Sequence, residues 1–496
     1  MSSAGNIRTA LLVGGLLAGA LCAPARGQET TSAPQTLAAR LRVHPIIQNV
    51  VRGAQPDPSD YAILRNQHGV TRAIALLTQD AVGDAARKAA ADAGIEYVFM
   101  PITAAGDDQR IDRSAVREVV DLLKTSAGGV TYIHDDNGKD RTGVVEFAYR
   151  VLVGQANYAA AMHAVLKRGF NASRLTGYQE DMKLLASGLD ALPELQIMPI
   201  SDVDLFGRGR RVALQGVRLN VKTMGEGPPV YVLHGGPGES HITLRPYLDG
   251  LAERNTLVYF DQRGCGYSTR PQFREAYAID RLVEDLEQLR QELGHEKISL
   301  LAQSSGGAIA VRYALAHRAH VDKLVIVTSW ASAEEIQPSE ILGLLLMAQE
   351  DQEALNKVLM RLRKQGRDFN DEELSEMQKL FYPSQFFGRM TAEFRNDWSR
   401  RARLSAMVYN AMSGEYFVKQ GQEHKFDLRG DLPQLQGTPT LVIAGKYDIV
   451  TPPPVVKTFA NRIPGARFEV LDRSGHYPFV EENKRFIRLV REFLAE

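Results

Sequence analysis

Cysteine is scarce in this sequence, which has two cysteines among its 496 residues, Cys22 and Cys265. A framework of several disulfides is therefore excluded. Cysteine and histidine also do not gather at the spacings of zinc ligands, so we expect no structural metal site and no cofactor.

An excess of charge of either sign is also missing. Lysine and arginine number 59, as do aspartate and glutamate. A protein that binds nucleic acid through a positive field is not expected to have this balance. Hydrophobic residues at 44% and charged residues at 24% are typical of a globular chain, and 496 residues suffice for two or three domains of about 150 residues.

The first 25 residues have the pattern of an export signal. Arg8 is their only charge, and an apolar stretch and an Ala-Pro-Ala site follow it. This stretch is shorter than the ~20 residues that span a membrane. We predict a signal peptide at 1–25, a linker at 26–42 and a periplasmic or secreted protein without stable membrane insertion. An uncleaved anchor and a lipoprotein site at Cys22 are the alternatives.

Residues 43–190 alternate between apolar runs and helical patterns, as in an α/β domain. We expect strands at 73–77, 96–100 and 130–133, and helices at 58–69, 81–94 and 114–124. The loop from His134 to Gly143 then leads into an apolar helix, with Arg141 near the helix start. Main-chain N–H groups, the helix dipole and an arginine at such a position form a cradle for an anion.

This domain resembles the dual-specificity and tyrosine phosphatase family. The resemblance is carried by Arg52-Gly53-Ala54-Gln55-Pro56 and by the loop His134 to Gly143. It covers about 140 residues and implies a phosphate loop, with a general acid at Asp107 or Asp108.

The family's nucleophile is a cysteine directly after the histidine, and here that position is Asp135. A thiolate attacks phosphorus readily, whereas a carboxylate places negative charge against the phosphate. We therefore predict an inactive domain with a degenerate phosphate loop, in which Asp135 neutralises Arg141. A module that binds a cation or another ligand is the alternative.

After a linker at 191–204, residues 205–496 repeat the order strand, loop, helix. Buried strands are expected at 230–233, 257–260, 298–301, 324–327, 441–443 and 468–471. Such strands between helices indicate a parallel sheet covered on both faces. Residues of about 330–430 interrupt this pattern with helical spacing, which predicts a helical cap that admits small substrates.

A serine at a turn between a buried strand and the following helix is the predicted nucleophile. Ser304 has small residues two positions before and after it, Ala302 and Gly306. Small residues are needed there because neighbouring main chain approaches closely. If Ser305 were the nucleophile, Gln303 would occupy the crowded position, so Ser304 is favoured.

Serine needs a general base, and the base needs an orienting carboxylate. Asp448 and His476 each follow a predicted strand, where open α/β sheets place their sites. They also come in the chain order serine, acid, histidine that this architecture uses. The predicted triad is therefore Ser304, Asp448 and His476.

A glycine-rich loop follows the strand at 230–233. Its sequence is His234-Gly235-Gly236-Pro237-Gly238, and we expect the N–H groups of Gly236 and Ser305 to face a developing oxyanion. This loop and Asp261-Gln262-Arg263-Gly264-Cys265-Gly266-Tyr267-Ser268 resemble the proline iminopeptidase family, which has the α/β-hydrolase fold. The predicted fold class is thus α/β, with an N-terminal phosphatase-like domain before an α/β-hydrolase domain with a helical cap.

The resemblance implies removal of an N-terminal residue, often proline, from a short peptide. An aminopeptidase must compensate for desolvating the substrate's ammonium, which requires a carboxylate. The segment Met412 to Phe417 resembles the family's cap segment that carries such a glutamate, so the resemblance implies Glu415 as the amine anchor. Glu334 and Glu335 are the alternatives, and Gly235 is the other expected substrate-binding residue.

Two further functions stay open. An esterase or small-amide hydrolase would use the same triad, because this fold accepts many substrates. A non-catalytic binding protein on two degenerate enzyme folds is the other possibility. We expect a small peptide, amide or ester as substrate, and no nucleic acid partner.

Overall fold

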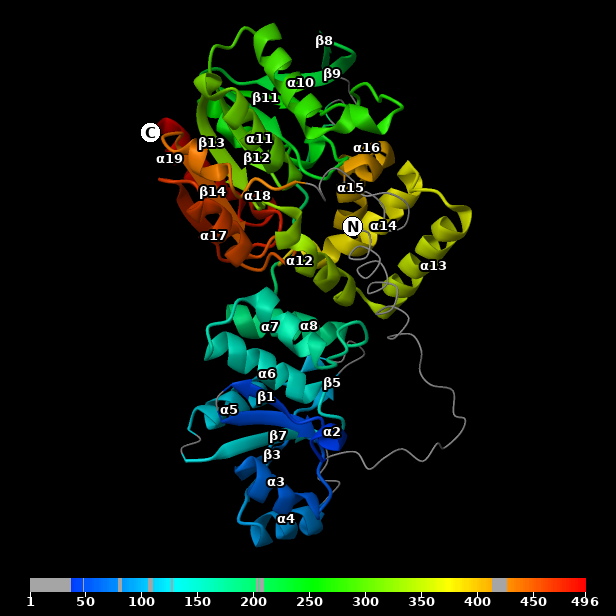
Figure 1. The fold of residues 1–496 in the computed structure, drawn as a ribbon, viewed down its shortest axis with the longest axis vertical. Helices are drawn as coiled ribbons and strands as arrows, with labels where there is room; N and C mark the ends of the chain where they lie inside the picture. Colours follow the sequence, from blue (N-terminus) through cyan, green and yellow to red (C-terminus); the bar gives the residue numbers. More distant parts are fainter. Residues whose placement is uncertain are drawn as a thin grey trace, which may run out of the picture. The chain divides into compact units, whose positions relative to one another are not determined.

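A computed structural model of the chain describes residues 37–47, 49–78, 83–105, 110–125, 128–201, 204, 209–412 and 426–496. The chain divides into two compact units between Leu192 and Pro193 (Figure 1). The predicted signal peptide and linker up to residue 36, Asp107, Asp108 and Glu415 lie outside the described residues. Within the described ranges, no helix has both the length and the apolar character needed to cross a membrane.

The N-terminal unit contains a five-stranded sheet in the order β1-β2-β7-β3-β4. Within this sheet β1 and β2 pair antiparallel, and the other neighbouring strands pair parallel. The strands are β1 (His44–Ile47), β2 (Val50–Ala54), β3 (Val70–Ala75), β4 (Glu96–Phe99) and β7 (Val130–Asp135), with a separate pair β5 (Ala104–Ala105) and β6 (Arg110–Ile111). The helices are α2 (Leu37–Leu41), α3 (Asp60–His68), α4 (Gly83–Asp92), α5 (Arg113–Lys124), α6 (Arg141–Leu152), α7 (Tyr158–Lys167) and α8 (Thr176–Ser187).

Strand β7 is longer than the predicted 130–133. Its polar end, His134 and Asp135, pairs in parallel register with Gly53 and Ala54 of β2. The prediction of this strand used a run of apolar residues, and such a run stops at the first polar residue. His134 and Asp135 belong to the strand because their main chain pairs with β2, which does not depend on an apolar side chain. The central strand therefore ends at Asp135, and the loop to α6 starts from the middle of the sheet.

The C-terminal unit contains an eight-stranded sheet in the order β15-β14-β13-β12-β10-β11-β9-β8. Strands β10 to β15 run parallel, and β8 and β9 add an antiparallel edge. The strands are β8 (Arg210–Leu214), β9 (Val217–Met224), β10 (Pro229–Leu233), β11 (Thr256–Phe260), β12 (Ile298–Gln303), β13 (Val321–Val327), β14 (Thr440–Gly445) and β15 (Arg467–Leu471).

Helices cover both faces of this sheet. Alternate residues of a strand point to opposite faces, and in β10 Tyr231 and Leu233 pack into one core while Val230 and Val232 pack into another. The first core includes α10 (Ile279–Glu292), α11 (Ser305–Ala316) and α17 (Pro453–Asn461). The second includes α18 (Pro478–Glu481) and α19 (Asn483–Ala495). Short 3-10 turns lie at His241–Thr243, Asp249–Glu253, Arg274–Tyr277, Arg318–His320 and Leu432–Leu435.

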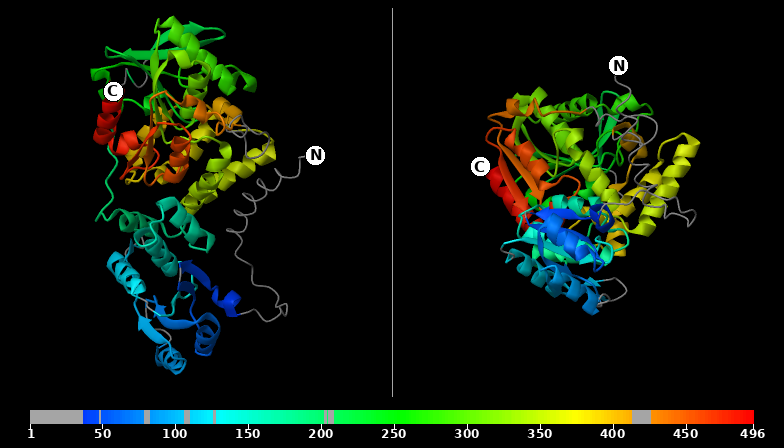
Figure 2. Two further views of the ribbon diagram at one scale, coloured as in Figure 1. Left: turned by 60° about the vertical axis from the view of Figure 1, so that its left-hand side comes forward. Right: turned by 60° about the horizontal axis from the view of Figure 1, so that its bottom comes forward.

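In the described part of the chain between β13 and β14, five helices form the cap. They are α12 (Ala333–Leu345), α13 (Gln349–Gln365), α14 (Asp371–Gln385), α15 (Ala392–Ala402) and α16 (Ala406–Met412). They group on one side of the sheet (Figures 1 and 2). Phe386, directly after α14, and Trp398 of α15 pack edge to face with ring centroids 5.5 Å apart, and both belong to the second core. The cap is thus anchored by aromatic packing to the sheet domain.

Part of the predicted linker 191–204 belongs to the C-terminal unit. Leu195 is buried in the second core, and its N–H donates to the carbonyl of Arg389. Arg401 Nη2 donates to the Met198 carbonyl at 2.9 Å. The composition of this short segment is typical of a connector. The burial of Leu195 and the hydrogen bonds to the main chain of Leu195 and Met198 nevertheless attach it to the cap.

Candidate active site

Ser304 lies at the sharp turn where β12 ends and α11 begins. Its main chain has φ 53° and ψ −125°, a conformation that L-residues rarely adopt. Its side chain is held at the end of the sheet, as a nucleophile elbow requires. Strands β10 and β13 flank β12, so the turn emerges from the middle of the sheet.

The small residues around Ser304 are needed for close contact. A Cβ at Gly306 would lie 2.7 Å from the His234 carbonyl oxygen. A Cβ at Gly235 would lie 2.9 Å from Ser304 Cβ. Ala302 is fully buried. Gly235, the predicted substrate-binding residue, thus packs directly against the nucleophile.

The predicted triad residues lie in one hydrogen-bonded line. His476 Nε2 is 3.0 Å from Ser304 Oγ, and His476 Nδ1 is 2.9 Å from Asp448 Oδ2. All three side chains are buried. These distances suit proton transfer from serine to histidine, with the aspartate orienting the ring.

Asp448 is held by the start of the segment that follows β14. Its Oδ1 accepts from the N–H groups of Val450 and Thr451 at 2.8 and 3.0 Å, and its Oδ2 accepts from Thr451 Oγ1 at 2.6 Å. These three donors fix the carboxylate toward His476. Thr451 is a supporting residue that sequence analysis missed, although an Asp-x-x-Thr turn is a recognisable local motif.

Two main-chain N–H groups are placed to receive an oxyanion. Ser305 is the first residue of α11, where helix N–H groups have no partner within the helix. Gly236 has φ 121°, a value that favours glycine, in the loop after β10. Among the described residues, neither N–H donates to another group. Both predicted donors are therefore available to a substrate oxygen.

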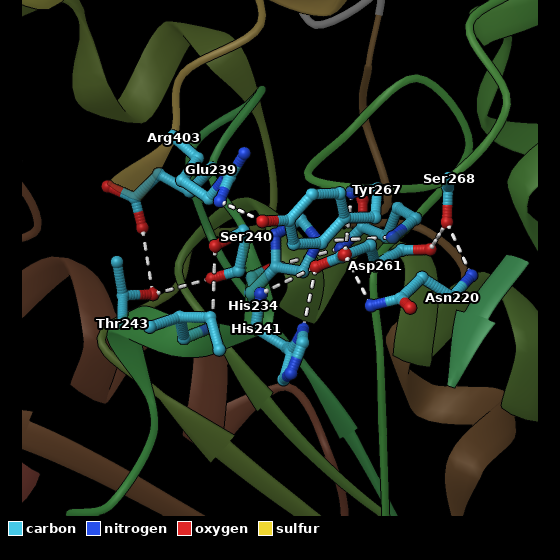
Figure 3. Close-up of polar contacts among 12 residues, drawn as sticks. Asn220, His234, Glu239, Ser240, His241, Thr243, Asp261, Tyr267, Ser268 and Arg403 are labelled. Carbon is cyan, nitrogen blue, oxygen red and sulfur yellow. Dashed lines mark hydrogen bonds and ion pairs between the residues drawn. The ribbon is translucent and has the colours of Figure 1, made fainter. Parts of the chain in front are cut away.

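A buried network fixes this glycine-rich loop. Asp261 Oδ1 accepts from His241 Nδ1 at 2.7 Å, and Oδ2 accepts from Asn220 Nδ2 at 3.0 Å and from the Tyr267 N–H at 2.9 Å (Figure 3). Burial opposes ionisation of Asp261, but His241 and the Tyr267 N–H hold its pKa well below the ordinary value. The motif that begins at Asp261 thus links the oxyanion loop to the sheet.

His234 opens the glycine-rich loop as a neutral ring. Burial lowers its pKa to about 4. Nδ1 lies 2.9 Å from the Gly235 carbonyl, and Nε2 accepts from the Gln262 N–H at 3.2 Å. One nitrogen donates and the other accepts, as in neutral imidazole. His234 therefore shapes the loop and does not act as a base.

Glu239 follows the glycine-rich loop and was missed by sequence analysis. It is 5% exposed, and burial raises its pKa to about 7. Its oxygens accept from the hydroxyls of Thr243 and Tyr477, each at 3.4 Å. Figure 3 shows the Glu239 side chain directed toward Thr243. The sequence offered one sign that Glu239 lies near the site, which is its position directly after the glycine-rich motif.

The alternative amine anchors are already paired. Glu334 forms an ion pair with Arg429 at 2.9 Å. Glu335 contacts Arg462 at 2.5 Å and accepts from the Ala331 N–H at 3.2 Å. Both carboxylates thus have an arginine partner in the structure, unlike a carboxylate that lacks a cation. Glu415 lies outside the described residues and stays a prediction.

In the N-terminal unit, the predicted phosphate loop is occupied by its own side chain. Asp135 Oδ1 accepts from the N–H groups of Asn137, Gly138 and Lys139, and Oδ2 accepts from the Thr142 N–H at 3.0 Å. The carboxylate thus takes the donors that the resemblance implied for a phosphate.

The expected pairing of Asp135 with Arg141 is wrong. Arg141 Nε donates to the Ile102 carbonyl at 2.9 Å, and Nη1 lies 3.4 Å from Asp136 Oδ2. The described residues contain no ion pair between Asp135 and Arg141. The N–H groups of the loop stabilise the Asp135 carboxylate instead. In the same described part, no three His, Cys, Asp or Glu side chains form a group able to hold a metal ion.

Comparisons with known proteins place the C-terminal unit. Residues 228–483 match the alpha/beta hydrolase fold family. The chain is 29% identical over 290 residues to the proline iminopeptidase of Heyndrickxia coagulans, covering 58% of this chain and 96% of that protein. It is 31% identical over 276 residues to the proline iminopeptidase of Clostridioides difficile (strain 630), covering 54% and 89%.

A solved structure of proline iminopeptidase from Mycobacterium smegmatis matches with a TM-score of 0.47 and 25% identity, covering 58% of this chain and 97% of that one. The family match spans more than half of the chain, and the relative from C. difficile is matched over most of its length. The chain therefore belongs to the α/β-hydrolase family and is a serine hydrolase of the proline iminopeptidase-like group.

Proposed function

We propose that this protein is an exported aminopeptidase that releases the N-terminal residue, proline above all, from small peptides. The observation that carries the proposal is the line from Ser304 through His476 to Asp448, at 3.0 and 2.9 Å, beside two N–H groups that have no partner among the described residues. The relatives named as proline iminopeptidases support the choice of substrate. The pattern of residues 1–25 supports export.

The first half of the reaction acylates Ser304. Its Oγ bonds to the carbonyl carbon of the N-terminal residue while its proton passes to His476 Nε2. The N–H groups of Gly236 and Ser305 receive the negative charge on the carbonyl oxygen, and Asp448 stabilises the imidazolium. The C–N bond then breaks, and His476 gives its proton to the departing amine.

The second half hydrolyses the ester on Ser304. Water loses a proton to His476 Nε2 and bonds to the ester carbon through the same tetrahedral geometry. The bond to Ser304 Oγ breaks as His476 returns the proton, which releases the free amino acid. The cap helices limit the space for longer chains and exclude bulk water.

Parallel assays of a proline arylamide and a short acyl ester test this function. We expect the arylamide to be hydrolysed, and Ser304→Ala to lower kcat by at least about 10³-fold on both substrates. Retention of more than a tenth of the activity by this variant contradicts the mechanism. Hydrolysis of the ester alone favours the esterase, and hydrolysis of neither favours a binding protein. For export, the protein recovered from the periplasm should begin after Ala25.

We further propose that the N-terminal unit is phosphatase-like and does not hydrolyse phosphate. Asp135 stands where a nucleophilic thiolate is required, and its carboxylate accepts from four main-chain N–H groups of the loop. An incoming phosphate would meet this charge and find its donors taken. Wild-type protein should therefore turn over no aryl phosphate.

A further inference from the structure

We propose that Glu239 binds the ammonium group of the substrate and so selects substrates with a free N-terminus. This inference rests on the proposed aminopeptidase function and names the residue that would recognise the amine. It assigns this role to the oxyanion-loop side of the site, in contrast to the Glu415 predicted from the cap.

Glu239 lies beside the oxyanion loop and beside Tyr477, the residue that follows the catalytic histidine. A Cβ at Gly235 would lie 2.9 Å from Ser304 Cβ, and a Cβ at Gly236 would lie 3.4 Å from Glu239 Cγ. Glu239 Oε1 is 3.4 Å from the hydroxyl of Tyr477, whose ring packs edge to face on His476 with centroids 5.2 Å apart. The carboxylate therefore lies near both the oxyanion loop and the segment that carries the catalytic histidine.

The chemistry of an aminopeptidase requires an anchor this close. In an N-terminal residue the amine nitrogen and the reacting carbonyl carbon are joined through one Cα and lie ~2.5 Å apart. A carboxylate that binds the amine must therefore lie within a few ångströms of the nucleophile and the oxyanion donors. Glu239 is placed for this role, since a Cβ at Gly236 would lie 3.4 Å from its Cγ and its carboxylate contacts the hydroxyl of Tyr477, the residue after His476.

Glu239 also lacks a positive partner. Two other buried carboxylates of the C-terminal unit have an arginine partner: Asp285 pairs with Arg263 at 2.6 Å, and Asp397 with Arg401 at 2.5 Å. Within the described residues, no lysine or arginine forms an ion pair with Glu239, and its two hydroxyl donors are both long. A buried carboxylate without a cation is costly unless a ligand supplies the charge.

The groups around Glu239 suit an ammonium. Those that titrate and face it are His476, Tyr477, Tyr382 and Cys265. The buried hydroxyl of Tyr382 has no hydrogen-bond partner among the described residues. Burial raises the pKa of Glu239 to about 7, which is the direction that burial of a carboxyl without a cationic partner produces.

Two aryl esters that differ in one group test the proposal. Proline and cyclopentanecarboxylic acid have the same ring, with NH₂⁺ in the first and CH₂ in the second. For Glu239→Gln we expect kcat/KM to fall about 10- to 1,000-fold on the prolyl ester. The fold loss of kcat/KM on the carbocyclic ester should be at least about ten times smaller than the fold loss on the prolyl ester. Glu393→Gln, on an exposed residue of α15, is the matched control and should change neither rate.

A binding measurement separates this proposal from the proposed function. In the inactive Ser304→Ala protein, calorimetry of L-prolinamide in two buffers at pH 7 should show release of about half a proton per ligand, because Glu239 with a pKa of about 7 is half protonated when empty. The additional Glu239→Gln substitution should abolish that release and weaken binding at least tenfold.

Three outcomes overturn the proposal. Equal losses of Glu239→Gln on both esters would assign the residue a positioning role toward His476. A selective loss with Glu415→Gln but none with Glu239→Gln would move the amine anchor to the cap. Prolinamide binding that is equally tight with and without the Glu239→Gln substitution would also overturn the proposal. Failure of the wild type on prolyl arylamides, with Glu239-dependent binding intact, overturns the proposed function alone.

Discussion

Glu239→Gln should change the stability of the C-terminal unit in a pH-dependent way. Burial raises the pKa of Glu239 to about 7, from an ordinary value of 4.5. Between these values the native protein keeps a proton that the unfolded chain has released. Wild-type stability therefore falls as pH rises from about 4.5 to about 7 and stays at the lower level above that. Glutamine does not titrate, so the variant avoids this loss.

The magnitude follows from the pKa difference. A gap of about 2.5 pKa units, at about 1.4 kcal/mol per unit, corresponds to ~3 kcal/mol. The variant's free energy of unfolding minus that of the wild type should thus increase by ~3 kcal/mol between about pH 4 and pH 8.5. Titrating groups that do not interact with Glu239 cancel in this difference.

Urea unfolding followed by tryptophan fluorescence measures this quantity. Both tryptophans of the chain, Trp330 and Trp398, are buried in the C-terminal unit, so their signal reports on the unit that contains Glu239. Glu393→Gln should show no change of this size with pH. A difference between Glu239→Gln and wild type that is equal at both pH values would refute the reasoning, because Glu239 would then be ionised in the fold without cost.

Two other predictions concern the loops. Asp135→Ala removes the acceptor of four main-chain N–H groups and should destabilise the N-terminal unit by ~2–4 kcal/mol. Inorganic phosphate should then raise the melting temperature of the variant but not that of the wild type. If phosphate has no effect on the variant, the prediction that the loop can bind an anion is wrong. Asp261→Asn should lower kcat about 10- to 100-fold on amine-bearing and amine-free substrates alike, because it loosens the oxyanion loop; a loss confined to amine-bearing substrates would show a different role.

The triad was predictable because each member is fixed by local sequence at a strand end. Ser304 needs small neighbours, and Asp448 and His476 follow buried strands whose carboxyl ends meet at one edge of the sheet. Parallel pairing of β12, β13, β14 and β15 then brings together residues up to 172 positions apart. The order of the parallel strands is therefore sufficient to predict that these three residues meet, without knowledge of the side-chain packing around them.

The remaining features depend on contacts that local patterns do not encode. Whether a glutamate is paired depends on arginines far along the chain, such as Arg429 and Arg462 for Glu334 and Glu335. Arg141 was expected to face Asp135, yet the Ile102 carbonyl holds its guanidinium. Leu195 in the predicted linker finds its partners in the cap. In each case the decisive neighbour lies in another element.

Two buried carboxylates in this chain differ in what they can still bind. Asp135 is satisfied by its own loop, with main-chain N–H donors on both oxygens, and a ligand could reach those donors only by displacing the side chain. Glu239 has a similar burial, but its donors are two hydroxyls at 3.4 Å. Hydrogen bonds at that length compensate little of the cost of burying a charge. The first carboxylate therefore closes an anion site, whereas the second keeps its capacity for a cation, beside the serine that would cleave the peptide.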